Sequence, residues 1–264
     1  MAMSAQATTP ATVDRIELEE RVKAMYHEVA ETPEHDFHFE MGRELAERLG
    51  YDPNALDRIP AAAIDSFAGV GHFFDMLALL PGESVLDLGS GSGMDSLIAA
   101  LAVGAEGRVQ GLDMTAAQRE KAARLARQAG FANVEFHAGY IESPPFADGS
   151  IDAVISNGVI NLSADKPRVF AEAARVLKPG GRLALADIVT EKALPESVSC
   201  NATLWAACIG GAMQQDDYVA VTESAGFVIQ TLREHPEYRF LTDSARGASE
   251  SYGVKSLSLL AIKR

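Results

Sequence analysis

The sequence has few cysteines, fewer basic than acidic residues and no long apolar run, and each of these features excludes classes of protein. Only two cysteines occur among 264 residues, Cys200 and Cys208, and no Cys/His cluster has zinc spacing, which argues against a disulfide scaffold and a structural metal. No apolar run approaches the roughly 20 residues that a membrane-spanning helix needs. The first 13 residues lack the basic and apolar regions of a signal peptide, so we expect free thiols and a cytoplasmic location.

Basic side chains are outnumbered by acidic ones. The chain has 23 Lys and Arg against 37 Asp and Glu, which gives a formal net charge of −14. Such a surface repels phosphate groups, and no Lys/Arg cluster offers a local basic groove, which argues against nucleic acid or an anionic membrane as partner. Because 47% of the residues are hydrophobic, the chain can bury a continuous core. We therefore expect a globular protein that acts on a small molecule.

The expected elements divide the chain into two parts. Residues 1–60 are interpreted as a leader and a helical cap, with helices over residues 14–30 and 41–49. Residues 61–264 are interpreted as the main domain, because strands and helices alternate there.

The main domain has the pattern of a parallel α/β sheet. Apolar segments suited to strands alternate with segments of helical periodicity, which indicates parallel pairing with right-handed crossovers. The expected strands are 84–88, 108–112, 133–137, 151–156, 182–188, 228–233 and 256–262. The expected helices are 94–103, 115–130, 165–177 and 216–225. We therefore predict a Rossmann-like, doubly wound, mostly parallel seven-stranded sheet with an N-terminal helical cap and an insertion at residues 189–214, after the fifth strand.

Two helix boundaries carry specific signals. Gly50 should end the helix over residues 41–49, in which Met41 is expected to be buried. Thr115 and Gln118 have the spacing of a capping box, in which two side chains satisfy backbone N–H groups at a helix start.

A glycine-rich turn follows the first expected strand. Gly89, Gly91 and Gly93 stand at alternate positions, where they let the backbone turn sharply and approach a ligand, and the next helix offers free N–H groups. Asp87 precedes this turn. Asp113 ends the second expected strand, where its carboxylate is placed to accept both ribose hydroxyls of an adenosine. This combination predicts an adenosine-containing cofactor.

The later motifs identify a family. A G-x-G-x-G turn with an acid two residues upstream resembles motif I of the class I S-adenosylmethionine (SAM)-dependent methyltransferases. Residues 139–142 (GYIE), 151–157 (IDAVISN) and 175–181 (RVLKPGG) resemble that family's further motifs. A nicotinamide-dependent oxidoreductase is disfavoured, because its fingerprint is G-x-G-x-x-G and no Tyr-x-x-x-Lys motif follows.

The resemblance implies that SAM is bound at the glycine-rich turn and at the ends of the following strands. Tyr26 is added because the N-terminal helix could place its ring over the methionine end of SAM, although plain packing is the alternative. The expected cofactor-binding residues are Tyr26, Asp87, Gly89, Gly91, Asp113, Met114, Ile141, Glu142 and Asn157.

A narrower resemblance to the arsenite methyltransferases covers residues 155–166, 205–212 and 66–71. That family holds trivalent arsenic with one cysteine thiolate from each of these three elements. In this chain the first two positions are Val70 and Gly158, and only Cys208 remains. Arsenic(III) is soft and prefers thiolates, so a three-thiolate arsenite site is not expected.

Several residues are candidates for the acceptor side of the site. His72 follows the turn that contains Val70 and is a candidate general base, with a solvent-facing loop histidine as the alternative. Cys208 is a candidate catalytic contact or a buried small hydrophobe. The expected acceptor-side residues are Val70, Gly158, Trp205 and His38, and packing is the alternative for the last two.

Three functions stay open on the sequence. The first is a SAM-dependent methyltransferase whose small-molecule acceptor is not arsenite. The second is an arsenite or thiol-arsenical methyltransferase with fewer thiolates. The third is a SAM-binding protein without catalysis. The loss of two thiolates favours the first function over the second.

Overall fold

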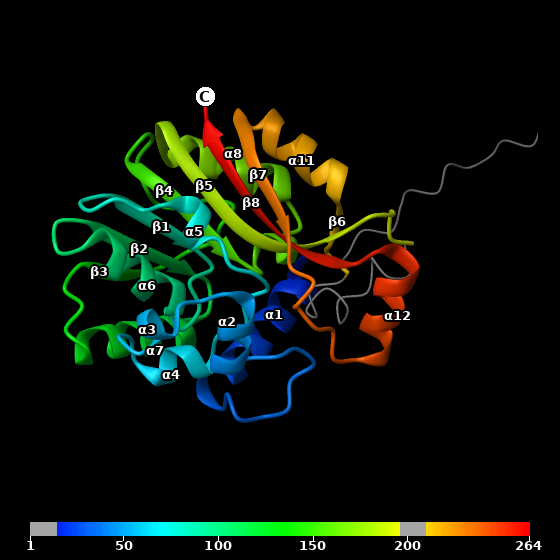
Figure 1. Cartoon of the computed structure of the whole chain (residues 1–264), viewed down its shortest axis with the longest axis horizontal. Coiled ribbons are helices and arrows are strands. Elements are labelled where there is room, and N and C mark those ends of the chain that lie inside the picture. The colour runs from blue at the N-terminus through cyan, green and yellow to red at the C-terminus, as the bar shows by residue number, and fades with distance from the viewer. Residues whose placement is uncertain (1–14, 196–209) are drawn as a thin grey trace, which may run out of the picture.

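The computed structural model describes residues 15–195 and 210–264, and a single sheet forms its centre (Figure 1). The strands are β1 (Ser84–Leu88), β2 (Arg108–Asp113), β3 (Val134–Ala138), β4 (Ile151–Asn157), β5 (Leu177–Thr190), β6 (Met213–Gln214), β7 (Phe227–Glu234) and β8 (Lys255–Lys263). Their order is β3-β2-β1-β4-β5-β8-β7, with β6 pairing to β5 off this path. β1 to β5 pair in parallel, whereas β8 is antiparallel to both of its neighbours.

This topology confirms the predicted doubly wound, mostly parallel α/β sheet. All seven expected strands are present within a few residues, and the eighth is β6, a two-residue strand too short to show a periodicity. The order reverses between β1 and β4, and in open α/β sheets ligands bind at such a switch point, outside the carboxyl ends of the strands.

The helices cover both faces of the sheet and one of its ends. They are α1 (Arg15–Glu31), α2 (Arg43–Leu49), α3 (Pro53–Leu56), α4 (Ala61–Asp65), α5 (Phe74–Leu77), α6 (Met94–Val103), α7 (Ala116–Gln128), the 3₁₀ helix η1 (Ile160–Leu162), α8 (Lys166–Val176), α11 (Gln215–Ser224) and α12 (Asp243–Tyr252). The expected helices are all present. The helices α3, α4, α5, η1 and α12 were not predicted. The first four are too short to show a periodicity, and in α12 Ala245 is the only buried apolar residue, so no apolar stripe marks it.

Two boundary predictions were wrong in detail. Thr115 makes no side-chain capping bond, and Gln118 instead donates to the Tyr26 carbonyl at 2.8 Å and accepts from Ser92 Oγ at 2.5 Å. Tertiary contacts with α1 and the glycine-rich turn thus replace the local capping box. Met41 precedes α2 and is only half-buried, although Gly50 ends that helix in the left-handed conformation as predicted.

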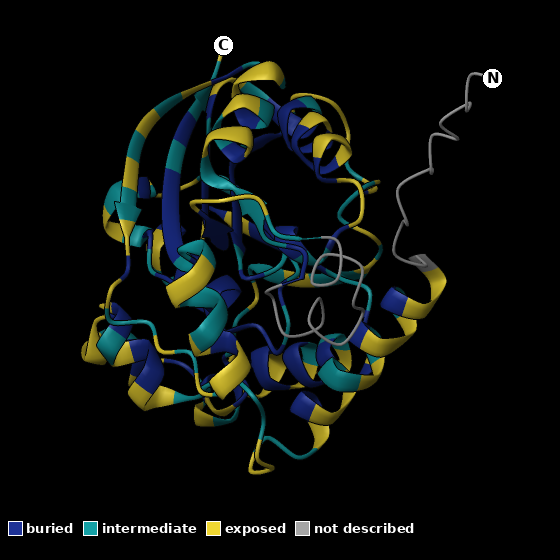
Figure 2. Cartoon of the chain, turned by 90° about the vertical axis from the view of Figure 1, so that its right-hand side faces the viewer, coloured by how far each residue is buried: buried dark blue, intermediate teal, exposed yellow. Residues whose placement is uncertain are grey.

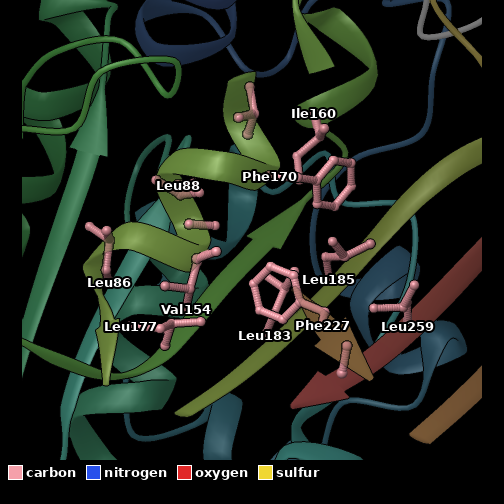
Figure 3. Packing of buried hydrophobic residues seen from close by; sticks show 14 of the residues in the cluster. Leu86, Leu88, Val154, Ile160, Phe170, Leu177, Leu183, Leu185, Phe227 and Leu259 are labelled. Carbon is pink, nitrogen blue, oxygen red and sulfur yellow. The ribbon is translucent and has the colours of Figure 1, made fainter. Parts of the chain in front are cut away.

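The core lies on both faces of the sheet. On one face, Leu86, Val154 and Leu185 belong to one cluster of buried residues with Phe170 of α8 (Figure 3). On the other face, Val85 and Ile155 pack among residues of α5 and α6. Figure 2 shows the same arrangement, with the strands largely buried and the outward faces of the helices exposed. Burial on both faces explains the near-continuous apolar runs of the central strands.

The N-terminal helices lie at one end of this sheet, as Figure 1 shows for α1, α2 and α4. α1 and α4 pack on α7, and Leu18 and Val22 of α1 are buried against Tyr26, Met114 and Leu162. The helices therefore reach the carboxyl ends of the central strands. Within the described ranges, no helix is both long enough and apolar enough to cross a membrane.

Candidate functional site

A cleft opens at the carboxyl ends of β1, β2 and β4. Its walls come from α1, the segment before α5, the glycine-rich turn, the segment after β3 and the turn into η1. All nine expected cofactor-binding residues line this cleft, and so does Gly158. The sequence motifs, which are spread over more than 130 positions, thus meet in one place.

The glycine-rich turn takes a conformation that side chains disfavour. Gly89, Gly91 and Gly93 have φ angles of +74°, +51° and +92°, in the left-handed region. A Cβ atom at Gly89 would lie 2.4 Å from Val159 Cγ2, so the backbone there is packed directly against the turn after β4. The turn leaves the first N–H groups of α6 next to the cleft, as a binding site for a polar ligand requires.

Asp113 ties this turn to the next strand. Its carboxylate accepts from the Gly91 N–H at 2.9 Å and from the Thr115 N–H at 2.8 Å. Each carboxylate oxygen has a second lone pair, so both remain able to accept a ligand hydroxyl. Burial raises the pKa of Asp113, while the two backbone bonds oppose that rise. The carboxylate is therefore fixed in place and retains the acceptor capacity that a ribose diol needs.

A buried hydroxyl supports the fit of SAM to this cleft. Ser90 Oγ is buried, lines the cleft and has no hydrogen-bond partner within the part of the chain that the structure describes. Buried polar atoms without a partner are rare, and a polar ligand group is one way to satisfy such an atom. With Asp113, Ile141 and the glycine-rich turn beside it, the donor and acceptor set matches an adenosyl amino acid.

Two of the other carboxylates that line the cleft, Asp87 and Asp95, are buried. Burial, and then the nearby charge of Asp95, raises the pKa of Asp87 to about 8. Burial likewise raises the pKa of Asp95 to about 6, opposed by hydrogen bonds from Tyr51 and Asn157. Sequence reasoning missed Asp95, because an acidic residue in the first turn of a helix is common on electrostatic grounds alone.

The Asn157 side chain was expected to bind the cofactor, but its carboxamide is engaged within the protein. Its Oδ1 accepts from the Val70 N–H at 2.8 Å and the Gly71 N–H at 3.3 Å, and its Nδ2 donates to Tyr51 Oη and Asp95 Oδ2. Asn157 thus lines the cleft while it joins β4, α6 and the segment before α5. Any contact that it makes to SAM is additional to these bonds.

Every backbone N–H and C=O group of residues 70–72 forms a hydrogen bond with a side chain. The bonding side chains are Asn157, Arg233, His235, Ser256 and Ser258. Four of them lie on or just after β7 and β8. A turn held in this way is preorganised, so its apex presents a fixed surface behind the cleft.

Asn157→Ala is expected to lower the free energy of unfolding by about 2 kcal/mol, because it leaves buried N–H groups of the 70–72 turn without acceptors. Chemical denaturation monitored by circular dichroism measures this loss. Asn54→Ala is the matched control, since the Asn54 carboxamide is exposed and, among the described residues, bonds only Asp52, and we expect a change of no more than about 0.5 kcal/mol. Equal losses in the two variants would contradict the role of Asn157.

Val70 and Gly158 lie side by side. Val70 is 1% exposed and packs in the core, and its Cγ1 lies 3.3 Å from the position of a Cβ atom at Gly158. Gly158 lines the cleft, whereas Val70 stands behind it. The two positions at which the resemblance places thiolates are therefore neighbours in space, and neither carries a sulfur atom.

The structure does not bring the two candidate histidines into the cleft. His72 packs edge-on against Tyr51, with ring centroids 4.6 Å apart, and burial lowers its pKa to about 4. His38 packs against Phe39, with ring centroids 4.7 Å apart, and does not line the cleft. Cys208 and Trp205 lie outside the described residues. His72 is therefore badly placed for a general base at this cleft.

Comparison with known proteins agrees with the motifs. A family model described as a methyltransferase domain matches residues 79–226. The arsenite methyltransferase of Halobacterium salinarum is 40% identical over 75% of this chain and 51% of that protein. The arsenite methyltransferase of Aquipseudomonas alcaligenes is 46% identical over 64% of this chain and 50% of that protein. The chain thus spans about half the length of these curated relatives.

A solved structure extends the comparison to three dimensions. The arsenic(III) S-adenosylmethionine methyltransferase of Chlamydomonas reinhardtii matches with a TM-score of 0.62 and 31% identity, over 84% of this chain and 74% of that one. Sequence motifs, topology and cleft residues agree with these matches. The chain therefore belongs to the class I SAM-dependent methyltransferases and, within them, to the group similar to the arsenite methyltransferases.

Proposed function

We propose that this chain transfers a methyl group from SAM to a small-molecule acceptor in the cytoplasm. The observation that supports this function most directly is the glycine-rich turn fixed to Asp113 at the switch point of the sheet. SAM supplies a methyl group on a positively charged sulfur, from which a nucleophile can displace it in line. The protein's part is to orient the two reactants and to exclude water, and we assign this part to α1 and the segment before α5, which line the cleft.

The charges of the cleft restrict the acceptor. Its described charged residues are Glu19, Asp87, Asp95, Asp113 and Glu142, and no lysine, arginine or histidine lines it in the described ranges. The segments outside those ranges contain no basic side chain either. An anionic acceptor would meet repulsion from these carboxylates, with no compensating cation among the described residues that line the cleft. We therefore propose a neutral or cationic acceptor, and not a nucleic acid or a phosphorylated molecule.

The described residues that line the cleft include no histidine, lysine or cysteine that could deprotonate the acceptor. The bases available there are carboxylates, and burial raises the pKa of Asp87 to about 8 and that of Asp95 to about 6. A soft or readily ionised nucleophile needs no stronger base. This requirement favours a thiol or an acidic carbon or oxygen acceptor over an unactivated alcohol.

The corner formed by Val70 and Gly158 argues against arsenite held by three thiolates. Valine and glycine offer no ligand to a soft metalloid, and no group of three or more His, Cys, Asp or Glu side chains in the described part of the chain could hold a metal ion. Cys208 alone remains at a ligand position of the related enzymes. We propose that the acceptor differs from arsenite.

Formation of S-adenosylhomocysteine (SAH) tests the proposal. With SAM binding verified by calorimetry, we expect arsenite plus glutathione to produce no more SAH than glutathione alone. Neutral thiols and carbon or oxygen acids then form the acceptor panel, in which at least one class should be methylated. Robust arsenite-dependent turnover would contradict the argument from Val70 and Gly158, and the absence of SAM binding would contradict the proposed function as a whole.

A further inference from the structure

The η1 turn, residues 159–164, contacts three other walls of the cleft. Val159 packs directly on the glycine-rich turn, where a Cβ atom at Gly89 would overlap its side chain. η1 also contributes to the apolar cluster of α1. Ser163 Oγ donates to Glu142 Oε1 at 2.5 Å, which joins the η1 turn to the segment after β3. The position of this turn therefore determines how the walls of the cleft lie relative to one another.

Two buried charged side chains hold the backbone of the η1 turn from behind. Asp187 of β5 is 1% exposed and accepts from the Asn161 N–H at 2.9 Å. Lys166, the first residue of α8, is 5% exposed and donates to the Ser163 carbonyl at 2.8 Å. Neither side chain lines the cleft. An anion thus meets an N–H donor and a cation meets a C=O acceptor at opposite ends of η1, and such charge-assisted bonds are stronger than neutral ones.

The burial of these two charges is unfavourable in itself. Burial lowers the pKa of Lys166 and raises the pKa of Asp187, and each charge opposes the shift of the other. Asp187 also accepts from Tyr218 Oη at 3.1 Å and from the Ile188 N–H at 3.0 Å. Replacing both members of a buried pair by neutral side chains is often neutral or stabilising, whereas loss of one member is costly. Stability of the fold is therefore a poor explanation for two charges that bond the same turn.

We propose that Lys166 and Asp187 are positioning residues that hold the η1 turn in place as the common wall of the cleft, so that SAM binds to a preformed site. The inference rests on the proposed function and deepens it, because it assigns to SAM binding two side chains that lie outside the cleft. A wall that is already in place does not have to be ordered when the ligand binds, and ordering of that kind lowers affinity.

The double variant Lys166→Met/Asp187→Asn distinguishes an effect on the cleft from an effect on the fold. Both charges are removed together, so no unpaired charge stays buried, and we expect a melting temperature within about 5 °C of the wild type. SAM affinity should fall about tenfold, because a thioether and a neutral amide hold the two ends of η1 less firmly. Thermal unfolding monitored by circular dichroism and calorimetric titration with SAM measure the two quantities.

Hydrogen exchange reports on the turn itself. In the ligand-free double variant, peptides that cover residues 159–164 should exchange about tenfold faster than in the wild type, while β1 keeps its exchange rate. Lys178→Met/Asp152→Asn is the matched control, since it makes the same two substitutions in an ion pair of 2.6 Å that joins β4 to β5 and does not line the cleft. We expect it to change neither SAM affinity nor exchange in the η1 turn.

Tyr218→Phe separates the two bonds to η1 from the rest of the network around Asp187. It removes a donor to the Asp187 carboxylate but leaves both charges and both bonds to the η1 turn. We therefore expect SAM affinity to change by less than about threefold. The single variants Lys166→Met and Asp187→Asn should each lower the melting temperature more than the double variant does, because each leaves one buried charge without its counterpart.

The possible outcomes are distinct. Wild-type SAM affinity or wild-type exchange of the η1 turn in Lys166→Met/Asp187→Asn would overturn the inference and leave the proposed function intact. A double variant that loses stability in step with affinity, or a control pair that loses as much affinity, would indicate a role in folding and would also overturn it. Failure of SAM to bind the wild-type protein would overturn the proposed function, and this inference with it.

Discussion

Asp113→Ala is expected to raise the Kd for SAM about a hundredfold. Two ligand hydroxyls lose a charged acceptor, and hydrogen bonds to charged groups contribute about 1.5–3 kcal/mol each. The Gly91 and Thr115 N–H groups also lose the carboxylate that fixes the glycine-rich turn. A combined loss near 3 kcal/mol corresponds to roughly a hundredfold change in affinity. Isothermal titration calorimetry at constant pH and salt measures it directly.

Asp113→Asn sharpens this prediction. An amide keeps one acceptor oxygen but turns an N–H₂ donor toward either the Gly91 or the Thr115 N–H, where a donor meets a donor. We therefore expect Asp113→Asn to be almost as weak as Asp113→Ala, despite its similar shape. Glu120→Gln, which removes one negative charge from the exposed side of α7, controls for the change in net charge. A Kd within threefold of the wild type in Asp113→Ala would remove Asp113 from the cofactor site.

The sequence was sufficient for those parts of the molecule that local rules determine. The alternation of apolar strands and amphipathic helices predicted β1 to β5, β7 and β8, because burial on both faces leaves the central strands as short apolar runs that stand out between the helices. The glycine-rich turn and Asp113 were also predictable, since a left-handed turn after a strand and an acid after the next strand are local signals that the topology brings together.

Long-range contacts account for what the sequence did not show. Gln118 has the spacing of a capping residue, yet it bonds α1 and Ser92, which no local rule anticipates. The same holds for Tyr51, which reaches Asp95 across 44 positions, and for His72, which packs on Tyr51 and stays out of the cleft. α12 lacks an apolar stripe, so its position depends on tertiary packing and on its Thr242 cap.

The double variant Val70→Cys/Gly158→Cys is expected to gain arsenite-dependent SAH formation, at least tenfold above the wild type in the presence of glutathione. The structure places the two positions against each other, and Asn157, Ser256 and the other side chains around residues 70–72 hold one of them in place. Two adjacent thiolates, with Cys208 at the third position of the related enzymes, would restore the soft ligand set that As(III) prefers. Adding Cys208→Ser should abolish the gain, whereas adding Cys200→Ser should not.

The stability of the same variants tests whether the side chains at positions 70 and 158 are in contact. Gly158 has a φ of +72°, so Gly158→Cys alone carries a strain of about 1–2 kcal/mol and sets its Cβ against Val70 Cγ1. Val70→Cys alone removes a buried methyl group and costs about 1 kcal/mol. In the double variant the smaller side chain at position 70 makes room for the new one. The loss of stability in the double variant should therefore be smaller than the sum of the losses in the two single variants.

Additive losses measured by denaturation would show that the two side chains do not meet. If the double variant then had no arsenite turnover, the distance between the two thiols would be the reason, and not the ligand chemistry. Sub-additive losses without turnover would instead indicate that the third ligand is missing, because Cys208 alone has to complete the site.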